Sequence, residues 1–147
     1  MLLAELRNEL LNQHKELRDF AVTVTDVAES ARADPARLPE LRTVLIQLAS
    51  KVLAHNAFED RELHAILSTI DAWGPIRDQL VDERHECEHE AILAAVRAAG
   101  RQSSPDAIAD ATAQALADLA SHMAREEREI LHPDVLRDDL ITSGVGG

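Results

Sequence analysis

The sequence predicts an all-α protein, an antiparallel up-down-up-down four-helix bundle. Four long segments show the three- and four-residue alternation of apolar positions that is typical of amphipathic helices. Three short stretches rich in helix-breaking residues separate these segments, at residues 33–39, 73–75 and 100–106. Because links this short join helices that lie side by side and run in opposite directions, the expected order is up-down-up-down.

Length and composition support the same fold class. The chain has 147 residues, which is enough for one domain with its own hydrophobic core. Apolar residues make up 46% of the sequence but aromatic residues only 2%, and Leu and Ala dominate the apolar set. This balance favours helices, because strands are enriched in aromatic and β-branched residues.

The first two helices are expected to follow apolar stripes that polar residues interrupt. The first stripe consists of Leu3, Leu6, Leu10, His14, Leu17, Ala21, Val24, Ala28 and Ala31. The second consists of Leu41, Leu45, Leu48, Val52, His55, Glu59, Leu63, Ile66 and Ile70. Residues at this spacing share one face of a helix, which we expect to face the bundle interior.

The last two helices show the same pattern. The third is expected to begin near Pro75, since proline is favoured in a first turn, and its stripe is His85, His89, Ile92, Val96 and Ala99. The fourth follows Ser104 and stops before Pro133, and its stripe is Ile108, Thr112, Ala115, Leu119, His122, Glu126 and Ile130. We therefore predict a bundle over residues 1–133 and a C-terminal tail over residues 134–147.

The charge balance argues against two classes of partner. The formal net charge is -12, and the sequence concentrates no Lys/Arg footprint of the kind that nucleic acid or an anionic membrane requires. No segment resembles a signal peptide or a membrane span. A lone cysteine, Cys87, cannot form an internal disulfide, so the expected location is the reducing cytoplasm. The sequence does not indicate a protein partner.

The residues most informative about function are histidines and glutamates at stripe positions that should be apolar. They are His14, His55, Glu59, His85, His89, His122 and Glu126. Apart from His14 they form pairs four residues apart, and four residues advance a helix by about 400°. Both members of each pair therefore leave the same face, one turn apart, and point into the bundle.

Burial of such groups without partners is unfavourable, by roughly 2–7 kcal/mol for a neutral polar group and by more for a charge. A bound metal ion removes this cost. Five imidazoles and two carboxylates suit iron, manganese or zinc, and no thiolate biases the choice toward softer metals. Bundle proteins build two-metal sites from inward-pointing residues of this kind.

In chain order the set reads as a lone His, then H-x-x-x-E, then H-x-x-x-H, then a His with a carboxylate one turn later. The corresponding segments are NQHKELR, HNAFEDREL, RHECEHEAIL and HMAREEREILHP. In this order the chain resembles the hemerythrin-like proteins, which contain the hemerythrin HHE cation-binding domain. The likeness covers nearly the whole chain, roughly residues 5–133.

The resemblance implies a centre of two iron ions, bridged by two carboxylates and by an oxygen species. The implied ligands are, for one iron, His85, His89 and His122, and for the other, His14 and His55. Together with two bridging carboxylates and a bridging oxygen, these ligands leave one position open on the second iron. An open position is typical of a reactive metal site rather than a structural one.

The bridging carboxylates implied by the resemblance are Glu59 and one residue of the last helix. The oxygen carriers of the family place an Asp five residues after the final His, whereas this chain has Glu126 at plus four and Glu127 at plus five. Many HHE-domain proteins use a Glu at plus four. Glu126 also stays on the His122 stripe, while Glu127 lies about 100° further round the helix. We expect Glu126 to bridge, with Glu127 as the alternative.

Other residues with metal-binding side chains are expected to lie outside the centre. His64 is about 180° round the helix from His55 and should face solvent. His132 should interact with the end of the last helix, and Cys87 should be a packed or partly exposed thiol. Three acids of the third helix are expected on a solvated face, from which one could orient a ligand histidine: Glu86, Glu88 and Glu90.

We interpret the chain as a non-haem di-iron protein that binds dioxygen, nitric oxide or peroxide at an open iron position, for oxygen binding or sensing. A di-iron enzyme acting on these molecules and an iron storage or delivery protein are the alternatives, which fold resemblance does not separate. The histidine-rich ligand set and the absence of Tyr favour binding. The small ligand should bind at the iron held by His14 and His55, in a pocket walled by Leu10, Leu17, Val52 and Phe58.

Overall fold

The computed structural model describes residues 3–67 and 74–132, except for the side chains of residues 64, 67 and 74–82. These residues form α1 (Leu3–Ala33), the short 3-10 helix η1 (Pro35–Arg37), α2 (Leu38–Leu67), α3 (Gly74–Gly100) and α4 (Pro105–Glu129). No strand occurs in the described ranges. The tail predicted for residues 134–147, and its boundary at residue 133, lie outside them.

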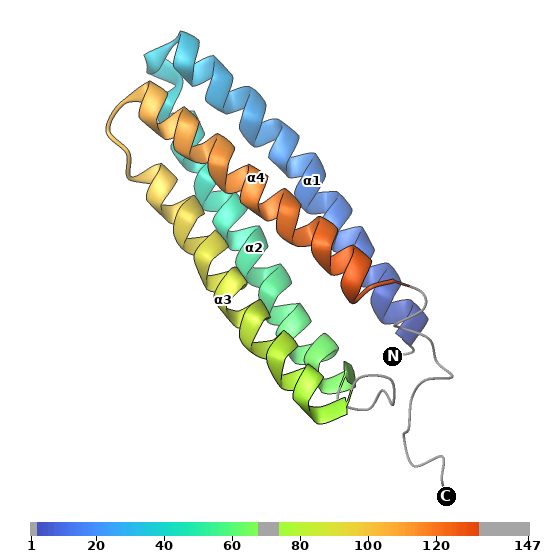
Figure 1. Cartoon of the computed structure of the whole chain (residues 1–147). Coiled ribbons are helices and arrows are strands. Elements are labelled where there is room, and N and C mark those ends of the chain that lie inside the picture. Colours follow the sequence, from blue (N-terminus) through green and yellow to red (C-terminus); the bar gives the residue numbers. More distant parts are fainter. Residues whose placement is uncertain (1–2, 68–73, 133–147) are drawn as a thin grey trace, which may run out of the picture.

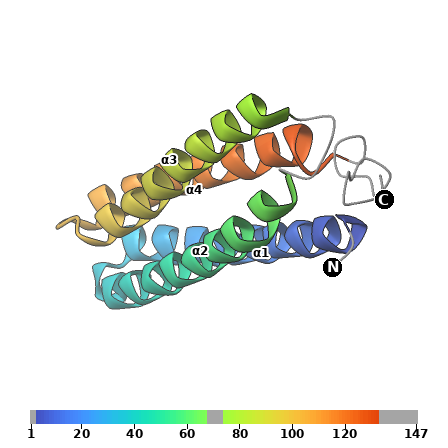
Figure 2. The same ribbon diagram turned by 90° about the horizontal axis from the view of Figure 1, so that it is seen from below.

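The four helices alternate in direction. Figure 1 shows that α1 begins at the end of the bundle where α2 ends, α3 begins and α4 ends. Figure 2 shows two layers, one made of α1 and α2 and the other of α3 and α4. Packing joins α1 with α2, α2 with α3, α3 with α4, and α4 with α1. The predicted all-α, up-down-up-down bundle is confirmed. Within the described residues, no helix combines the length and the apolar character needed to cross a membrane.

Side chains in two of the links fix where helices begin. The side chain of Ser104 caps α4 by accepting a hydrogen bond from the Ala107 amide at 3.1 Å, and Pro105 occupies the first turn. The side chain of Asp34 likewise accepts a bond from the Ala36 amide at 3.1 Å at the start of η1. Such caps satisfy amides that the first helical turn leaves without partners.

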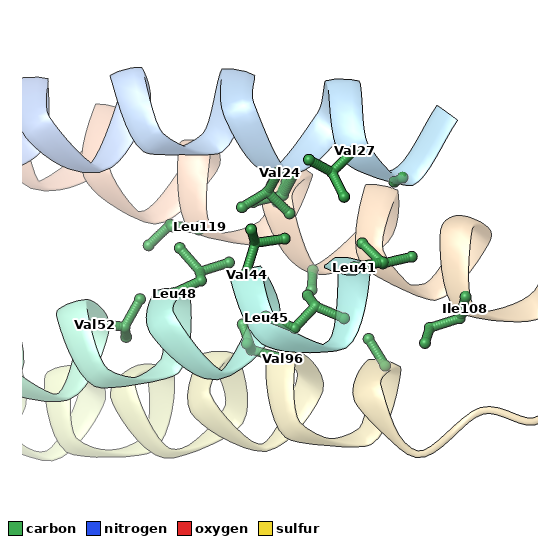
Figure 3. Close-up of a cluster of buried hydrophobic side chains, with 14 of the residues drawn as sticks. Val24, Val27, Leu41, Val44, Leu45, Leu48, Val52, Val96, Ile108 and Leu119 are labelled. Atoms are coloured by element: carbon green, nitrogen blue, oxygen red, sulfur yellow. The ribbon is translucent and has the colours of Figure 1, made fainter. Parts of the chain in front are cut away.

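Two groups of buried apolar side chains fill the bundle. The larger group draws on all four helices, at the end where α1 leads into η1, and Figure 3 shows part of it, including Val24, Leu48, Val96 and Leu119. The smaller group, toward the opposite end, consists of Leu3, Leu6, Leu10, Leu63, Ile130 and Leu131. Along each stripe, the predicted metal ligands fall next to or between these two groups. The polar residues therefore lie inside the bundle with apolar layers on both sides.

We predict that truncating a core leucine of α2 destabilises the bundle far more than truncating a surface leucine of the same helix. Leu48 is fully buried, whereas Leu53 is 49% exposed. Leu48→Ala should lower the free energy of unfolding by roughly 2–5 kcal/mol, because it leaves a cavity. Leu53→Ala should cost less than half as much. Urea unfolding followed by circular dichroism, at equal metal content, measures both, and equal losses would contradict the described packing.

Candidate metal centre

The seven residues predicted as metal ligands meet in the interior of the bundle. Each of the four helices contributes at least one of them, and none exposes more than 6% of its surface: His14, His55, Glu59, His85, His89, His122 and Glu126. Helical spacing brings the pairs together, since both members of a pair leave the same face of their helix. The structure therefore places the whole predicted set at one site.

The carboxylates of Glu59 and Glu126 lie at the centre of the site. On one side, Glu126 Oε1 lies 3.1 Å from His14 Nε2, and Glu59 Oε2 lies 3.1 Å from His55 Nε2. On the other side, Glu126 Oε2 lies 3.4 Å from His122 Nε2. Glu59 Oε1 lies 3.4 Å from His89 Nε2 on that same side. Each carboxylate thus faces imidazoles in two directions.

These contacts define two groups of potential ligand atoms that share both carboxylates. One group is His14, His55, Glu59 and Glu126, and the other is Glu59, His89, His122 and Glu126. Within each group, one ligand atom per residue lies within 4.8 Å of the others. Carboxylates with two oxygens each can serve two ions at once, so the arrangement suits a pair of neighbouring cation positions.

The central atoms make no hydrogen bonds within the described part of the chain. They are the Nε2 atoms of His14, His55, His89 and His122 and both carboxylate oxygens of Glu59 and Glu126. Two ligands bonded at right angles to one ion, each at about 2.1 Å, lie roughly 3 Å apart, close to the separations found here. Buried polar atoms without partners are unfavourable, and a cation would satisfy them together. The residues therefore fit a bound metal.

The electrostatics of the two carboxylates point the same way. Burial raises the pKa of the Glu59 carboxyl, but the imidazoles of His55 and His89 outweigh burial and hold that pKa well below its ordinary value. Burial, and then the negative charge of Glu59, raise the pKa of the Glu126 carboxyl above its ordinary value. Two buried carboxylates this close cannot both ionise cheaply, whereas a cation between them would favour both charges.

His85 differs from the other four histidines in the way it faces the carboxylates. Its Nδ1 lies 3.2 Å from Glu59 Oε1, and its Nε2 lies 3.5 Å from Glu126 Oε2. Its ring is 5.6 Å from the ring of His89 and 5.8 Å from that of His122, measured between centroids. His85 therefore lies on the His89 and His122 side, but it spans both carboxylates and belongs to neither four-residue group.

The outer nitrogens of the other histidines are held by side chains that surround the site. His14 Nδ1 donates to Glu127 Oε2 at 2.8 Å, and His55 Nδ1 donates to Gln13 Oε1 at 2.7 Å. Because these oxygens can only accept, each Nδ1 carries a proton, which leaves the inward-facing Nε2 as the nitrogen that would bind a metal. Such bonds orient metal-binding imidazoles and raise their basicity.

The same support is built around the histidines on the other side. His122 Nδ1 donates to Glu88 Oε2 at 2.7 Å, and the guanidinium of Arg125 pairs with the second oxygen of Glu88. His89 Nδ1 lies 3.6 Å from Asp60 Oδ1, which is an electrostatic contact rather than a hydrogen bond. Of the three α3 acids considered for orienting a ligand histidine, Glu88 is the one that bonds to His122.

Glu127, the alternative bridge, lies outside the ring of central atoms. Its side chain is 26% exposed and accepts a bond from Arg18 at 2.7 Å as well as the bond from His14. Burial raises the pKa of the Glu127 carboxyl, but Arg18 and His14 outweigh it and leave that pKa below its ordinary value. An Arg–Glu–His chain thus runs inward here, matching the chain of Arg125, Glu88 and His122. Sequence reasoning missed the Arg members and Gln13, because nothing in a single helix pattern shows which residue of a neighbouring helix they meet.

Four other residues singled out from the sequence lie at the surface. Cys87, His132 and two of the α3 acids, Glu86 and Glu90, are exposed. The side chain of His64, predicted to face solvent, lies outside the described residues.

A surface pocket of about 370 Å³ lies between α1 and α2 and reaches His55. Leu17 and Phe58, two residues of the predicted wall, line it, whereas Leu10 and Val52 lie buried in the apolar groups and do not. The other walls are largely polar and include Glu9, Gln13, Glu16, Lys51 and Arg61. The pocket is therefore a polar approach to the His14 and His55 side of the site.

Comparison with protein families identifies the class of protein that this fold and site define. Residues 5–135 match the family model described as Hemerythrin HHE cation binding domain. The chain therefore belongs to the hemerythrin HHE cation-binding family, and the resemblance noted in the sequence is confirmed. Searches of curated proteins and of solved structures found no match. Family membership and the buried His/Glu groups together indicate a protein that binds a metal cation.

We predict that two adjacent glutamates of α4 differ sharply in their effect on the bound metal. Glu126→Gln should abolish most metal retention, because it removes the central carboxylate. Glu127→Gln should keep the metal but weaken it by about 10–100-fold, since it alters only the support of His14. Competition with a chelator, followed by metal analysis, measures both variants.

Glu129→Gln is the matched control on the same helix, because Glu129 pairs with Arg84 at the surface. This control should leave metal affinity unchanged. A larger loss with Glu127→Gln than with Glu126→Gln would mean that the carboxylate at plus five is the central ligand.

Proposed function

We propose that this chain holds two iron ions and binds dioxygen, or a related small molecule such as nitric oxide or peroxide, for oxygen binding or sensing. The observation that carries the proposal is the pair of buried ligand groups that share Glu59 and Glu126. A site for one ion would not need seven buried ligand residues, since one ion accepts about six ligand atoms.

The proposed ligands divide between the two irons as the family resemblance implies. For one iron they are His85, His89 and His122; for the other they are His14 and His55; Glu59 and Glu126 bridge them. The inward Nε2 atoms on both sides support this division, and the full burial of Glu126 supports it over Glu127. His85 is assigned to the side with more histidines, where its ring lies beside those of His89 and His122.

Iron bound at this site would supply the redox electrons for binding or reducing a small oxygen- or nitrogen-containing molecule. The protein contributes the setting. Nδ1–H bonds to Glu127, Gln13 and Glu88 keep the imidazole lone pairs directed inward. The apolar groups on both sides exclude water along the bundle axis. A nitrogen-rich ligand set of this kind favours reversible binding, whereas carboxylate-rich ligand sets are used for oxygenase chemistry.

The small ligand is proposed to bind on the side of His14 and His55. Fewer residues would ligate an iron on that side, so an ion held there would have room for an exogenous ligand. The pocket between α1 and α2 leads to His55 from the same side and supports this direction of approach. Gln13 stands between the pocket and the outer nitrogen of His55.

The second candidate is an enzyme that acts on peroxide, nitric oxide or dioxygen at the same centre. The polar walls of the pocket favour it, because charged and amide groups near a site help deliver protons, and a dry apolar wall would protect a bound ligand. The two candidates share the metal centre and differ in whether the small molecule leaves unchanged.

We also propose a cytoplasmic location. Cys87 is exposed, and an accessible thiol stays reduced most readily in that compartment. Fractionation of the source cells would test this.

For the iron-loaded, reduced protein we predict an optical change on addition of dioxygen that reverses when the gas is removed. Azide and nitric oxide should give their own spectra and compete with dioxygen. Stopped-flow spectroscopy with an oxygen electrode measures binding and consumption together. Steady consumption of dioxygen or peroxide over many turnovers would favour the enzyme, and the absence of any iron-dependent spectrum would contradict both candidates.

A further inference from the structure

A second hollow lies on the other flank of α2, between α2 and α3. It is a groove of about 500 Å³ with an apolar floor made by Leu45, Ala49 and Val96. It extends along α2 to Ile46 and Leu53, and it shares no lining residue with the pocket that reaches His55. The groove is therefore separate from the metal centre and its approach.

Two large apolar side chains that line the groove are strongly exposed. Ile46 is 72% exposed and Leu53 is 49% exposed. Within the described residues, one other large apolar side chain, Val22 on α1, is comparably exposed. An exposed apolar patch with polar residues around it is typical of a groove that binds another molecule.

The same groove is positively charged in a strongly acidic chain. Arg42, Arg97 and Arg101 line one end of it, and residues 41–53 and 91–101 contain no Asp or Glu. Over the whole chain, 27 acidic residues outnumber 15 basic ones, so this local excess runs against the overall composition. The bundle creates it by packing two acid-free segments side by side.

These arginines are available to bind an anion. In the described part of the chain, Arg97 and Arg101 form no ion pair, and Arg42 donates only to the Gln102 carbonyl at 3.3 Å. Two carbonyls at the end of α3, those of Ala98 and Ala99, already have partners in the amides of Arg101 and Gln102. The guanidinium groups are therefore not needed to cap these two carbonyls. Guanidinium forks match carboxylate geometry well.

We propose that this groove binds a carboxylic acid with a long apolar tail, the chemistry of a fatty acid. The carboxylate would pair with Arg97 and Arg101, and the tail would run along the apolar floor toward Leu53. The volume falls within the 300–1,000 Å³ typical of small-molecule sites. On this face of the bundle, the strongly exposed apolar residues are confined to the groove. Such a face is too small for a stable protein interface, which buries roughly 800 Å² per partner. A second copy docked by the same face would also bring arginines against arginines.

Calorimetric titration of the metal-loaded full chain with sodium dodecanoate, below its micelle concentration, tests this proposal. We expect saturable binding of one molecule per chain. Dodecyltrimethylammonium has the same tail and the opposite charge, and it should bind at least about tenfold more weakly. Octanoate, which has four fewer methylenes, should also bind at least about tenfold more weakly.

Two pairs of variants separate the head site from the tail site. Arg97→Gln/Arg101→Gln should weaken dodecanoate about tenfold, whereas Lys15→Gln/Arg37→Gln removes the same charge elsewhere and should not. Ile46→Ser should weaken it several-fold, whereas Val22→Ser, a matched exposed position on α1, should not.

Several outcomes would overturn the proposal. These are the absence of saturable binding, equal affinity for the cationic amphiphile, and equal losses in the variants and their controls. Full affinity in Arg97→Gln/Arg101→Gln would mean that the carboxylate binds elsewhere, such as at the metal. A dimer in sedimentation that Ile46→Ser dissociates would mean that a second copy covers the groove instead.

Discussion

Glu59 and Glu126 lie side by side in the middle of the bundle, without solvent and without hydrogen bonds to their carboxylate oxygens in the described part of the chain. Apolar groups on both sides along the bundle axis deny them water. Two buried negative charges this close are unfavourable unless positive charge lies between them. The surrounding imidazoles direct nitrogen atoms toward the same place, so the interior of the bundle is suited to hold a cation that neutralises both carboxylates.

The helices transmit this constraint outward. Three of the inward-facing imidazoles have an outer nitrogen that donates to a side chain on another helix: His14 to Glu127, His55 to Gln13 and His122 to Glu88. Arg18 and Arg125 hold those two glutamates in turn. Relative sliding of α1, α3 and α4 would break these bonds, so the support of the centre and the packing of the bundle reinforce each other.

Helical periodicity was enough to predict the four helices and the convergence of the seven polar residues, because His55 and Glu59 or His85 and His89 share a face whatever the neighbouring helix does. Side-chain contacts between different helices could not be predicted in this way. The partners Gln13 and Asp60, and the choice of Glu88 over the other α3 acids, depend on how far one helix is shifted along another. Spacing within one helix carries no information about that shift.

The charge pattern shows the same limit. Arg42 lies 55 residues before Arg97 in the sequence, so no single segment contains both arginines. The packing of α2 on α3 nevertheless places them in one groove. The pocket at His55 is likewise more polar than the stripe residues suggested, because Lys51 and Arg61 approach from the flanks of α2. A groove or pocket formed between two helices cannot be predicted from the periodicity of either helix alone.

The central claim is that two cations share the Glu59 and Glu126 carboxylates, and the stoichiometry of iron uptake tests it most directly. Protein stripped of metal would be titrated with ferrous iron under argon in a calorimeter. The account predicts saturation at two equivalents per chain. Saturation at one equivalent would contradict it.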